Sequence, residues 1–174
     1  YVLEALEKYP ALEIITLSRG DSLSLSGGHH IKFDLFSDDE FCLTDWVNEI
    51  PDKLIHLAWS GLPNYNDLIH LEENLPAQIR FLNSVVSQGV KDVTVVGTCF
   101  EYGMQEGTLH ENLKTDPENS YGIAKASLRR YLQVLHESRQ HDFSYKWARL
   151  FYTYGLGQGD RSLYSQLMKA INEG

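Results

Sequence analysis

A tyrosine and a lysine lie four residues apart at the start of a predicted helix, in the segment Ser120-Tyr121-Gly122-Ile123-Ala124-Lys125. Side chains at this spacing project from the same helical face, so the phenol and the ammonium should be neighbours. A phenol ordinarily titrates at about pH 10, and a nearby positive charge favours the phenolate. We therefore expect Lys125 to make Tyr121 a usable acid or base near neutral pH. The alternative is an ordinary solvated pair of side chains.

A hydroxyl side chain follows a short buried strand that the sequence predicts upstream. The β-branched run Val93-Thr94-Val95-Val96 is typical of a parallel strand, and it leads into Gly97-Thr98. In open α/β sheets, ligands bind beyond the carboxyl ends of the strands. We therefore expect the Thr98 hydroxyl to lie where a catalytic group is useful, with an ordinary turn-capping threonine as the alternative.

These segments and several others, taken in order, resemble the extended short-chain dehydrogenase/reductase family. The resemblance is to its NAD(P)-dependent nucleotide-sugar epimerase, dehydratase and ketoreductase branch, and it covers nearly the whole chain. The segments that carry it are Phe33-Asp34-Leu35, His56-Leu57-Ala58-Trp59, Asn74, Thr98 with Tyr102-Gly103, Tyr121 with Lys125, and Arg149-Leu150-Phe151-Tyr152-Thr153-Tyr154-Gly155. It implies an α/β fold with a doubly wound, Rossmann-like parallel sheet.

The hydrophobic pattern along the chain agrees with this class. It predicts strands at 12–17, 31–35, 53–59, 93–96 and 144–150, and helices at 2–6, 39–47, 68–89, 121–139 and 163–172. Alternating strands and helices predict a parallel sheet covered on both faces. We expect a truncated NAD(P)-binding domain over residues 1–155 and the start of a substrate-binding lobe over residues 156–174.

The first strand and glycine-rich turn of this fold, which hold the cofactor pyrophosphate, have no counterpart in the sequence. The chain opens within the helix that follows them, and Gly155, Gly157 and Gly159 come after the last predicted strand. Because the first strand is central in the 3-2-1-4-5-6 order, we expect a gap between the strands at 12–17 and 53–59. The chain is thus interpreted as a fragment that binds dinucleotide poorly on its own.

The resemblance also implies a set of cofactor contacts. Ser18-Arg19 stands where an acid would face the adenosine ribose, and an arginine can pair with a 2′-phosphate, so NADP is favoured and NAD is the alternative. The implied cofactor-binding residues are Arg19, Asp34, Leu35, Leu57, Ala58, Trp59, Asn74, Tyr121, Lys125 and Phe151. Each of these side chains also has a purely structural interpretation, and for Leu35, Leu57 and Phe151 packing and cofactor contact are expected to coincide.

The implied catalytic residues are Thr98, Tyr121 and Lys125. Tyr121 would exchange a proton with a sugar oxygen while the nicotinamide exchanges hydride with the same carbon. The substrate-binding candidates are Thr98, Cys99, Phe100, Tyr152 and Arg161. Cys99-Phe100 follows the threonine where sugar dehydratases carry an Asp-Glu pair, so dehydration is disfavoured. We expect reduction of a 4-keto nucleotide sugar, with 4-epimerisation or a non-catalytic NAD(P)-sensing module as alternatives.

Composition limits the partners. The 174 residues carry a formal net charge of −9, which disfavours nucleic acid. Two cysteines are too few for a disulfide framework or a cysteine-built zinc site, and His29-His30, expected in a loop, is given little weight as a metal ligand. No apolar run approaches the roughly 20 residues that span a bilayer. We expect a cytoplasmic protein without a metal or membrane partner, which could form a homodimer through the helices at 68–89 and 121–139.

Overall fold

The computed structural model describes residues 1–21, 28–37, 39–140, 142–155 and 158–173. Its strands and helices, in chain order, are α1 (Val2–Leu6), β1 (Ile15–Ser18), β2 (His29–Lys32), β3 (Lys53–His56), α2 (Leu75–Ser87), β4 (Asp92–Thr98), α3 (Ser120–Ser138), β5 (Ser144–Leu150) and α4 (Leu163–Glu173). Three short turns complete the list: the 3-10 turns η1 (Leu43–Asp45) and η3 (Cys99–Tyr102), and the π-helical turn η2 (His70–Asn74). This order confirms the predicted alternation of strands and helices.

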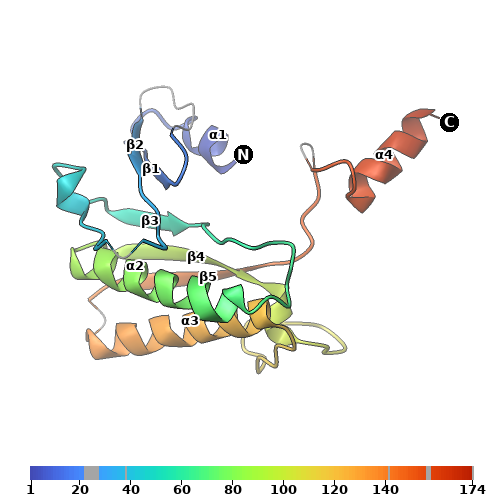
Figure 1. Cartoon of the computed structure of the whole chain (residues 1–174). Helices are drawn as coiled ribbons and strands as arrows, with labels where there is room; N and C mark the ends of the chain where they lie inside the picture. Colours follow the sequence, from blue (N-terminus) through green and yellow to red (C-terminus); the bar gives the residue numbers. More distant parts are fainter. Residues whose placement is uncertain (22–27, 38, 141, 156–157, 174) are drawn as a thin grey trace.

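The strands form two parallel sheets (Figure 1). In one sheet β1 pairs with β2, from Ile15 opposite His29 to Ser18 opposite Lys32. In the other, β4 lies between β3 and β5. Among the described residues no strand joins β1 to β3, so the gap expected at this position is present. The carboxyl ends of the strands nevertheless meet at a common edge, which is where this fold class binds its ligands.

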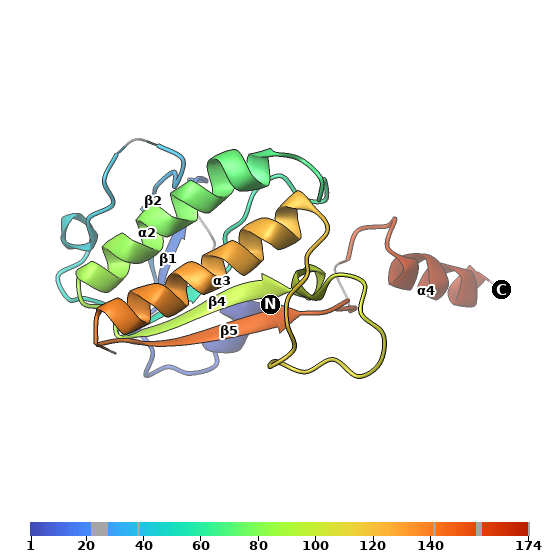
Figure 2. The ribbon, with the colours of Figure 1, turned by 90° about the horizontal axis from the view of Figure 1, so that it is seen from below.

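Helices α2 and α3 lie side by side across one face of the β3-β4-β5 sheet (Figure 2). Leucines of the two helices, including Leu82, Leu128 and Leu132, are fully buried and pack in one core with Val93 and Val95 of β4. The helical residues recur at the three-to-four-residue spacing that places them on one face. Burying each such side chain contributes roughly 1.5–3 kcal/mol. This core fixes the start of α3 against the end of β4.

The helix predicted at 39–47 is wrong, because only the single turn η1 forms there. Phe41 and Leu43 are both buried, a spacing that suits an extended segment. The carbonyl of Phe41 accepts hydrogen bonds from Ser84 Oγ at 2.6 Å and Gln88 Nε2 at 2.9 Å. The amide of Leu43 donates to Gln88 Oε1 at 2.6 Å. Side chains of α2 thus satisfy backbone groups that a helix would have paired internally.

Other predicted elements differ mainly in their boundaries. The strand expected at 31–35 lies earlier, at His29–Lys32, so the two histidines expected in a loop belong to β2. The strands expected at 12–17 and 53–59 are shorter. The helix expected at 68–89 begins with η2, continues as α2 with Pro76 in its first turn, and is followed by Gly89 at a φ of 111°. Proline is tolerated in the first turn of a helix, where its missing N–H would have no partner, and glycine is common just after the last turn because it adopts a positive φ.

Helix α4 lies away from the sheets (Figure 1). It buries no residue, and Leu163, Leu167 and Ile171 are exposed. The domain boundary predicted at 155/156 adjoins residues 156–157, which lie outside the described residues, so the division into two domains stays a prediction. Neither α4 nor another helix in the described ranges is long and apolar enough to cross a membrane.

Candidate active site

Three of the predicted side chains meet at the carboxyl end of β4. Thr98 is the last residue of β4, and Tyr121 and Lys125 lie one turn apart at the start of α3. Their exposed fractions are only 6%, 8% and 2%. A side-chain interaction joins Thr98 to the Tyr121 phenol, and Lys125 Nζ lies 5.9 Å from the centre of the Tyr121 ring. The structure therefore brings the candidate catalytic residues into one cluster.

The ammonium of Lys125 is held from two sides. Its Nζ donates a hydrogen bond of 2.7 Å to the carbonyl of Val96, two residues before Thr98 on β4. It also lies 4.0 Å from the centre of the Trp59 indole ring, in a cation–π contact. Burial lowers the pKa of Lys125 to about 7, and the negative charge of Glu101 opposes this shift. The side chain thus exchanges its proton near neutral pH.

The pKa of Tyr121 moves in the direction opposite to the expected one. Burial raises the pKa of the phenol, and the interaction with Thr98 only partly offsets this. The charges of Tyr65, Glu101 and Cys99 raise it further. This direction is opposite to the expectation that Lys125 brings the phenol toward neutrality, because burial is the largest cause of the shift. Tyr121 is therefore a neutral phenol that can donate a proton.

Aromatic rings surround Tyr121 and account for its desolvation. The centre of its ring lies 5.7 Å from that of Trp59, 5.6 Å from Tyr65, 5.3 Å from His70 and 6.2 Å from Phe100. The Tyr121 amide also donates to the carbonyl of Tyr65 at 3.0 Å. Tyr65 and His70, which follow β3, were not predicted as site residues, because no local motif marks them. Trp59 and Phe100 were predicted, and both form part of this wall.

His70 is fully buried and holds Trp59 in place. The indole Nε1–H of Trp59 donates to His70 Nδ1 at 3.1 Å. The other ring nitrogen, Nε2, must then carry the hydrogen, and it donates to the carbonyl of Asn64 at 2.8 Å. This chain of hydrogen bonds fixes the indole whose face contacts Lys125.

Asn74 holds the segment after β3 through its side chain, and its predicted cofactor contact stays a prediction. Its side chain is fully buried, and its Oδ1 accepts hydrogen bonds from the amide and hydroxyl of Ser60 at 3.1 and 3.2 Å. Its Nδ2 donates to the carbonyls of Ser60 and Ile69. These hydrogen bonds tie the segment after β3 to η2.

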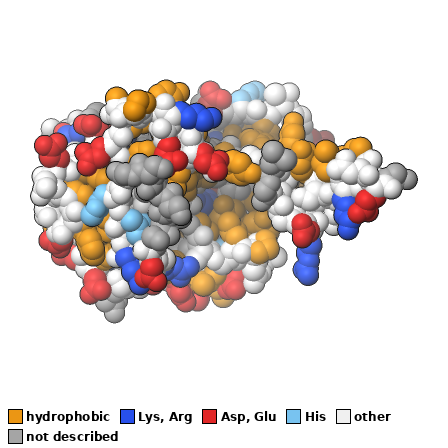
Figure 3. All heavy atoms as spheres, turned by 90° about the horizontal axis from the view of Figure 1, so that it is seen from above, with side chains coloured by type: hydrophobic (Ala, Val, Ile, Leu, Met, Phe, Trp, Pro, Cys, Tyr) orange, Lys and Arg blue, Asp and Glu red, His pale blue; other side chains and the backbone are white. Residues whose placement is uncertain are grey.

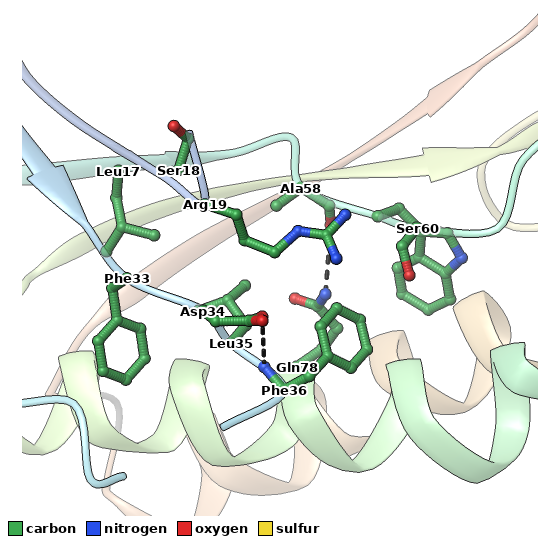
Figure 4. Close-up of a pocket in the computed structure, with 11 residues that line it drawn as sticks. Leu17, Ser18, Arg19, Phe33, Asp34, Leu35, Phe36, Ala58, Ser60 and Gln78 are labelled. Carbon is green, nitrogen blue, oxygen red and sulfur yellow. Dashed lines mark hydrogen bonds between the residues drawn. The ribbon is translucent and has the colours of Figure 1, made fainter. Parts of the chain in front are cut away.

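A cavity of about 190 Å³ lies where β1, β2 and β3 end (Figure 4). It is lined by the predicted residues Arg19, Asp34, Leu35, Ala58 and Trp59, and by Leu17, Ser18, Phe33, Phe36, Ser60 and Gln78. Pockets for small ligands occupy roughly 300–1,000 Å³, so this one suits part of a dinucleotide. Because Trp59 belongs both to this cavity and to the wall around Tyr121, the two sites adjoin.

Two charged side chains line the cavity. Arg19 extends across it from the end of β1, with its guanidinium 5.8 Å from the centre of the Phe36 ring (Figure 4). The carboxylate of Asp34 accepts a hydrogen bond of 3.0 Å from the Phe36 amide. A guanidinium and a carboxylate at this edge can bind ribose hydroxyls or a phosphate. The cavity therefore fits the adenosine end of a dinucleotide.

The remaining predicted residues lie outside this cluster or at its margin. Leu57 and Phe151 are each 50% exposed, just beyond β3 and β5. Cys99 is a partly buried free thiol beside the cluster. Tyr152 is 83% exposed and Arg161 is exposed. The surface is hollowed between the body of the molecule and α4, with hydrophobic side chains in the hollow (Figure 3).

The described ranges contain no candidate metal-binding site. No group of three or more His, Cys, Asp or Glu side chains there could hold a metal ion. The His30 ring instead contacts Thr16 Oγ1 at 2.9 Å and the carbonyl of Gly20 at 2.9 Å.

Comparison with known proteins places the chain in a family. It matches the model of the NAD dependent epimerase/dehydratase family over residues 1–174. It is 32% identical over 149 residues to the dTDP-6-deoxy-L-talose 4-dehydrogenase (NAD(+)) of Aggregatibacter actinomycetemcomitans, an alignment that covers 86% of this chain and 54% of that protein.

Two solved structures share its fold. One is MoeE5 in complex with UDP-glucuronic acid and NAD, with a TM-score of 0.76, 23% identity, and coverage of 97% of this chain and 56% of that one. The other is the UDP-glucuronic acid 4-epimerase of Bacillus cereus in complex with NAD, with a TM-score of 0.75, 21% identity, and coverage of 99% and 59%. The chain spans little more than half the length of the proteins it matches.

These comparisons do not support the predicted preference for NADP. The curated relative is named for NAD(+), and both solved structures contain NAD. They support the coarser prediction of a nicotinamide dinucleotide and a nucleotide sugar. Because the family model extends over residues 1–174 and the relative's identity of 32% runs through 86% of the sequence, the chain belongs to the NAD dependent epimerase/dehydratase family.

Proposed function

We propose that this chain carries the catalytic groups of an NAD-dependent oxidoreductase that acts at C4 of a nucleotide-activated sugar. The observation that carries the proposal is the meeting of the Thr98 and Tyr121 hydroxyls beside Lys125 at the rim of the sheet. Two hydroxyl groups at one point can bind a single sugar oxygen together. The similarity to a nucleotide-sugar 4-dehydrogenase supports C4 as the reacting carbon.

Tyr121, Thr98 and Lys125 have different roles in the proposed reaction. NAD, when bound, supplies or accepts the hydride. Tyr121 is protonated at neutral pH because its pKa is raised, so it donates to a C4 carbonyl oxygen in reduction and becomes a phenolate; in oxidation the phenol must first lose its proton to solvent before the phenolate accepts the proton of the C4 hydroxyl. Thr98 Oγ1 accepts a hydrogen bond of 3.3 Å from the Phe100 amide, and its hydroxyl interacts with the Tyr121 phenol, so a bound sugar oxygen would replace that phenol as the partner of the Thr98 proton. Lys125, with a pKa lowered to about 7, adds a nearby positive charge in its protonated form.

The cavity at the ends of β1, β2 and β3 would hold the adenosine part of the cofactor. Arg19, Asp34 and Trp59 are among the side chains that line it. We take NAD as the cofactor because the relative is an NAD(+) enzyme. The contact between Arg19 and Phe36 supports a packing role for the guanidinium that requires no 2′-phosphate.

Net oxidation or reduction is favoured over the two other reactions of the family. The curated relative is a dehydrogenase, which supports net hydride transfer over epimerisation. Dehydration requires a free acid and base after the threonine, and Cys99 and Phe100 supply neither. The next residue, Glu101, has both carboxylate oxygens engaged by other side chains.

The test is product analysis on the full-length protein with NAD⁺ and dTDP-6-deoxy-L-talose as the probe. We expect NADH to accumulate in step with a 4-keto sugar nucleotide identified by NMR. Inversion at C4 without net NADH would make the protein an epimerase. If neither product forms although NAD binds, the non-catalytic module is the better description.

Three further predictions concern the whole protein. We propose a cytoplasmic location, a homodimer formed through the helices at 68–89 and 121–139, and a substrate lobe that begins near residue 156. Each is open to direct measurement by fractionation, by light scattering and by an experimental structure of the full-length protein.

A further inference from the structure

A fully buried carboxylate, that of Glu101, lies directly behind Thr98. Its Oε1 accepts hydrogen bonds from the Thr98 amide at 2.9 Å and the Trp147 indole at 2.8 Å. Its Oε2 accepts from Arg149 Nε at 2.8 Å, and Arg129 Nε lies 3.8 Å away. A buried charge is tolerated only when donors and an opposite charge satisfy it, and here both are present.

The turn after β4 links this carboxylate to the candidate catalytic hydroxyl. Thr98 caps η3: its side chain accepts from the Phe100 amide, and Glu101 reaches back to the Thr98 amide. This reciprocal pair is a capping box, which fixes the backbone and the side chain of the capping residue together. The position of the Thr98 hydroxyl therefore depends on where Glu101 is held.

Strand β5 holds Glu101 in turn. Trp147 and Arg149 both belong to β5, which pairs with β4 in parallel register, with Arg149 opposite Gly97. A Cβ at Gly97 would collide with the Trp147 indole and the Glu101 carboxylate, so the absence of a side chain at Gly97 makes room for the contact. A capping box alone needs neither the arginine nor the indole. Their presence ties the end of β4 to β5 at the residue that carries the hydroxyl.

We propose that Glu101 is a positioning residue for Thr98, which it anchors to β5 so that the threonine hydroxyl faces the Tyr121 phenol. The inference rests on the proposed function, because it takes Thr98 as a ligand of the reacting sugar oxygen. Glu101 does not transfer a proton itself, since it is shielded from solvent and both of its oxygens are engaged. A displacement of about 1 Å at a reacting group can cost about a hundredfold in rate.

A double-mutant cycle on the full-length enzyme separates positioning from simple structural support. Glu101→Gln keeps the shape and the acceptor for the Thr98 amide but removes the charge that holds Arg149. Thr98→Val removes only the hydroxyl. We expect Glu101→Gln to lower kcat by about tenfold or more with the KM for NAD changed less than about twofold. In the Thr98→Val background the same change should have no further effect on kcat.

Each outcome of the cycle decides one point. If Glu101→Gln costs the same factor with and without the Thr98 hydroxyl, Glu101 supports the fold only and the inference is overturned. If Thr98→Val alone leaves kcat unchanged, it is the proposed role of Thr98 that fails. The exposed Glu106 provides the matched control, and Glu106→Gln should leave kcat unchanged. If Glu101→Gln does not fold, Trp147→Phe, which removes one donor to Oε1, replaces it in the same cycle with the same criteria.

Discussion

The ammonium of Lys125 lies 4.0 Å from the centre of the Trp59 ring, and the indole N–H of Trp59 donates to the buried ring of His70 at 3.1 Å. The indole thus connects a candidate catalytic lysine to a histidine that has no access to solvent. Its electron-rich face favours the charged lysine, while burial disfavours it. The pKa of Lys125 and the contribution of His70 to stability can therefore both be tested by substitution.

The first prediction concerns stability and pH. Burial lowers the pKa of Lys125 to about 7, whereas an unfolded lysine titrates near its ordinary value of 10.5. Between these two values the unfolded chain binds a proton that the folded chain releases, so the contribution of Lys125 to stability rises with pH and is constant below about 7. The difference in free energy of unfolding between the wild type and Lys125→Met should therefore increase from about pH 7 upward, by at most about 1.4 kcal/mol per pH unit. A pH-independent difference in urea unfolding would refute the lowered pKa.

The second prediction concerns His70. His70→Leu leaves the Trp59 indole N–H and the Asn64 carbonyl without their partner, at a cost of about 1–3 kcal/mol for each unpaired group. The side chain of His110 is exposed, so His110→Leu is the matched control and should change the free energy of unfolding by less than about 0.5 kcal/mol. Equal urea midpoints for the two variants would show that the buried histidine does not hold Trp59.

The third prediction is that Tyr121 titrates above its ordinary range. Burial raises the pKa of this phenol, so in the protein without ligands it should remain neutral beyond about pH 10. Carbon-13 NMR of labelled tyrosine rings follows each phenol separately, and the signal missing from Tyr121→Phe identifies the resonance. Titration of that signal near neutral pH would instead restore the simple model in which Lys125 stabilises the phenolate.

The fourth prediction concerns the choice of cofactor. With NAD as the natural cofactor, the wild-type enzyme should have a higher kcat/KM for NAD than for NADP. Arg19→Ala should reduce the use of NADP more than that of NAD, because only the 2′-phosphate offers the guanidinium a charged partner. Steady-state kinetics with both dinucleotides decides this, and a wild-type preference for NADP would revive the role first inferred for Arg19.

Elements whose own sequence pattern specifies them could be predicted well. Strand β5 lies at 144–150 as predicted, and α3 differs by one residue at each end. Leu128, Leu132 and Leu135 keep the helical spacing of a buried face throughout α3. The segment at 39–47 could not be predicted in this way, since its conformation depends on hydrogen bonds from Ser84 and Gln88, more than 40 residues away.

In the candidate site, too, the features set by local sequence could be predicted and those set by tertiary contacts could not. The positions of Thr98, Tyr121 and Lys125 follow from strand end and helix spacing, which are local properties. The direction of the Tyr121 pKa shift does not, because it depends on Tyr65 and on the other rings that pack around the phenol. Glu101 did have a readable signal, since Thr98 and Glu101 have the spacing of a capping box.

The most direct test of the account is the steady-state rate of the full-length Tyr121→Phe enzyme, with Tyr131→Phe in the same helix as the control. Loss of the phenolic proton should lower kcat by about 10²–10⁴-fold and leave NAD affinity unchanged, while the control keeps its activity. Turnover by Tyr121→Phe at the rate of the control would contradict the assignment of Tyr121 as the proton donor.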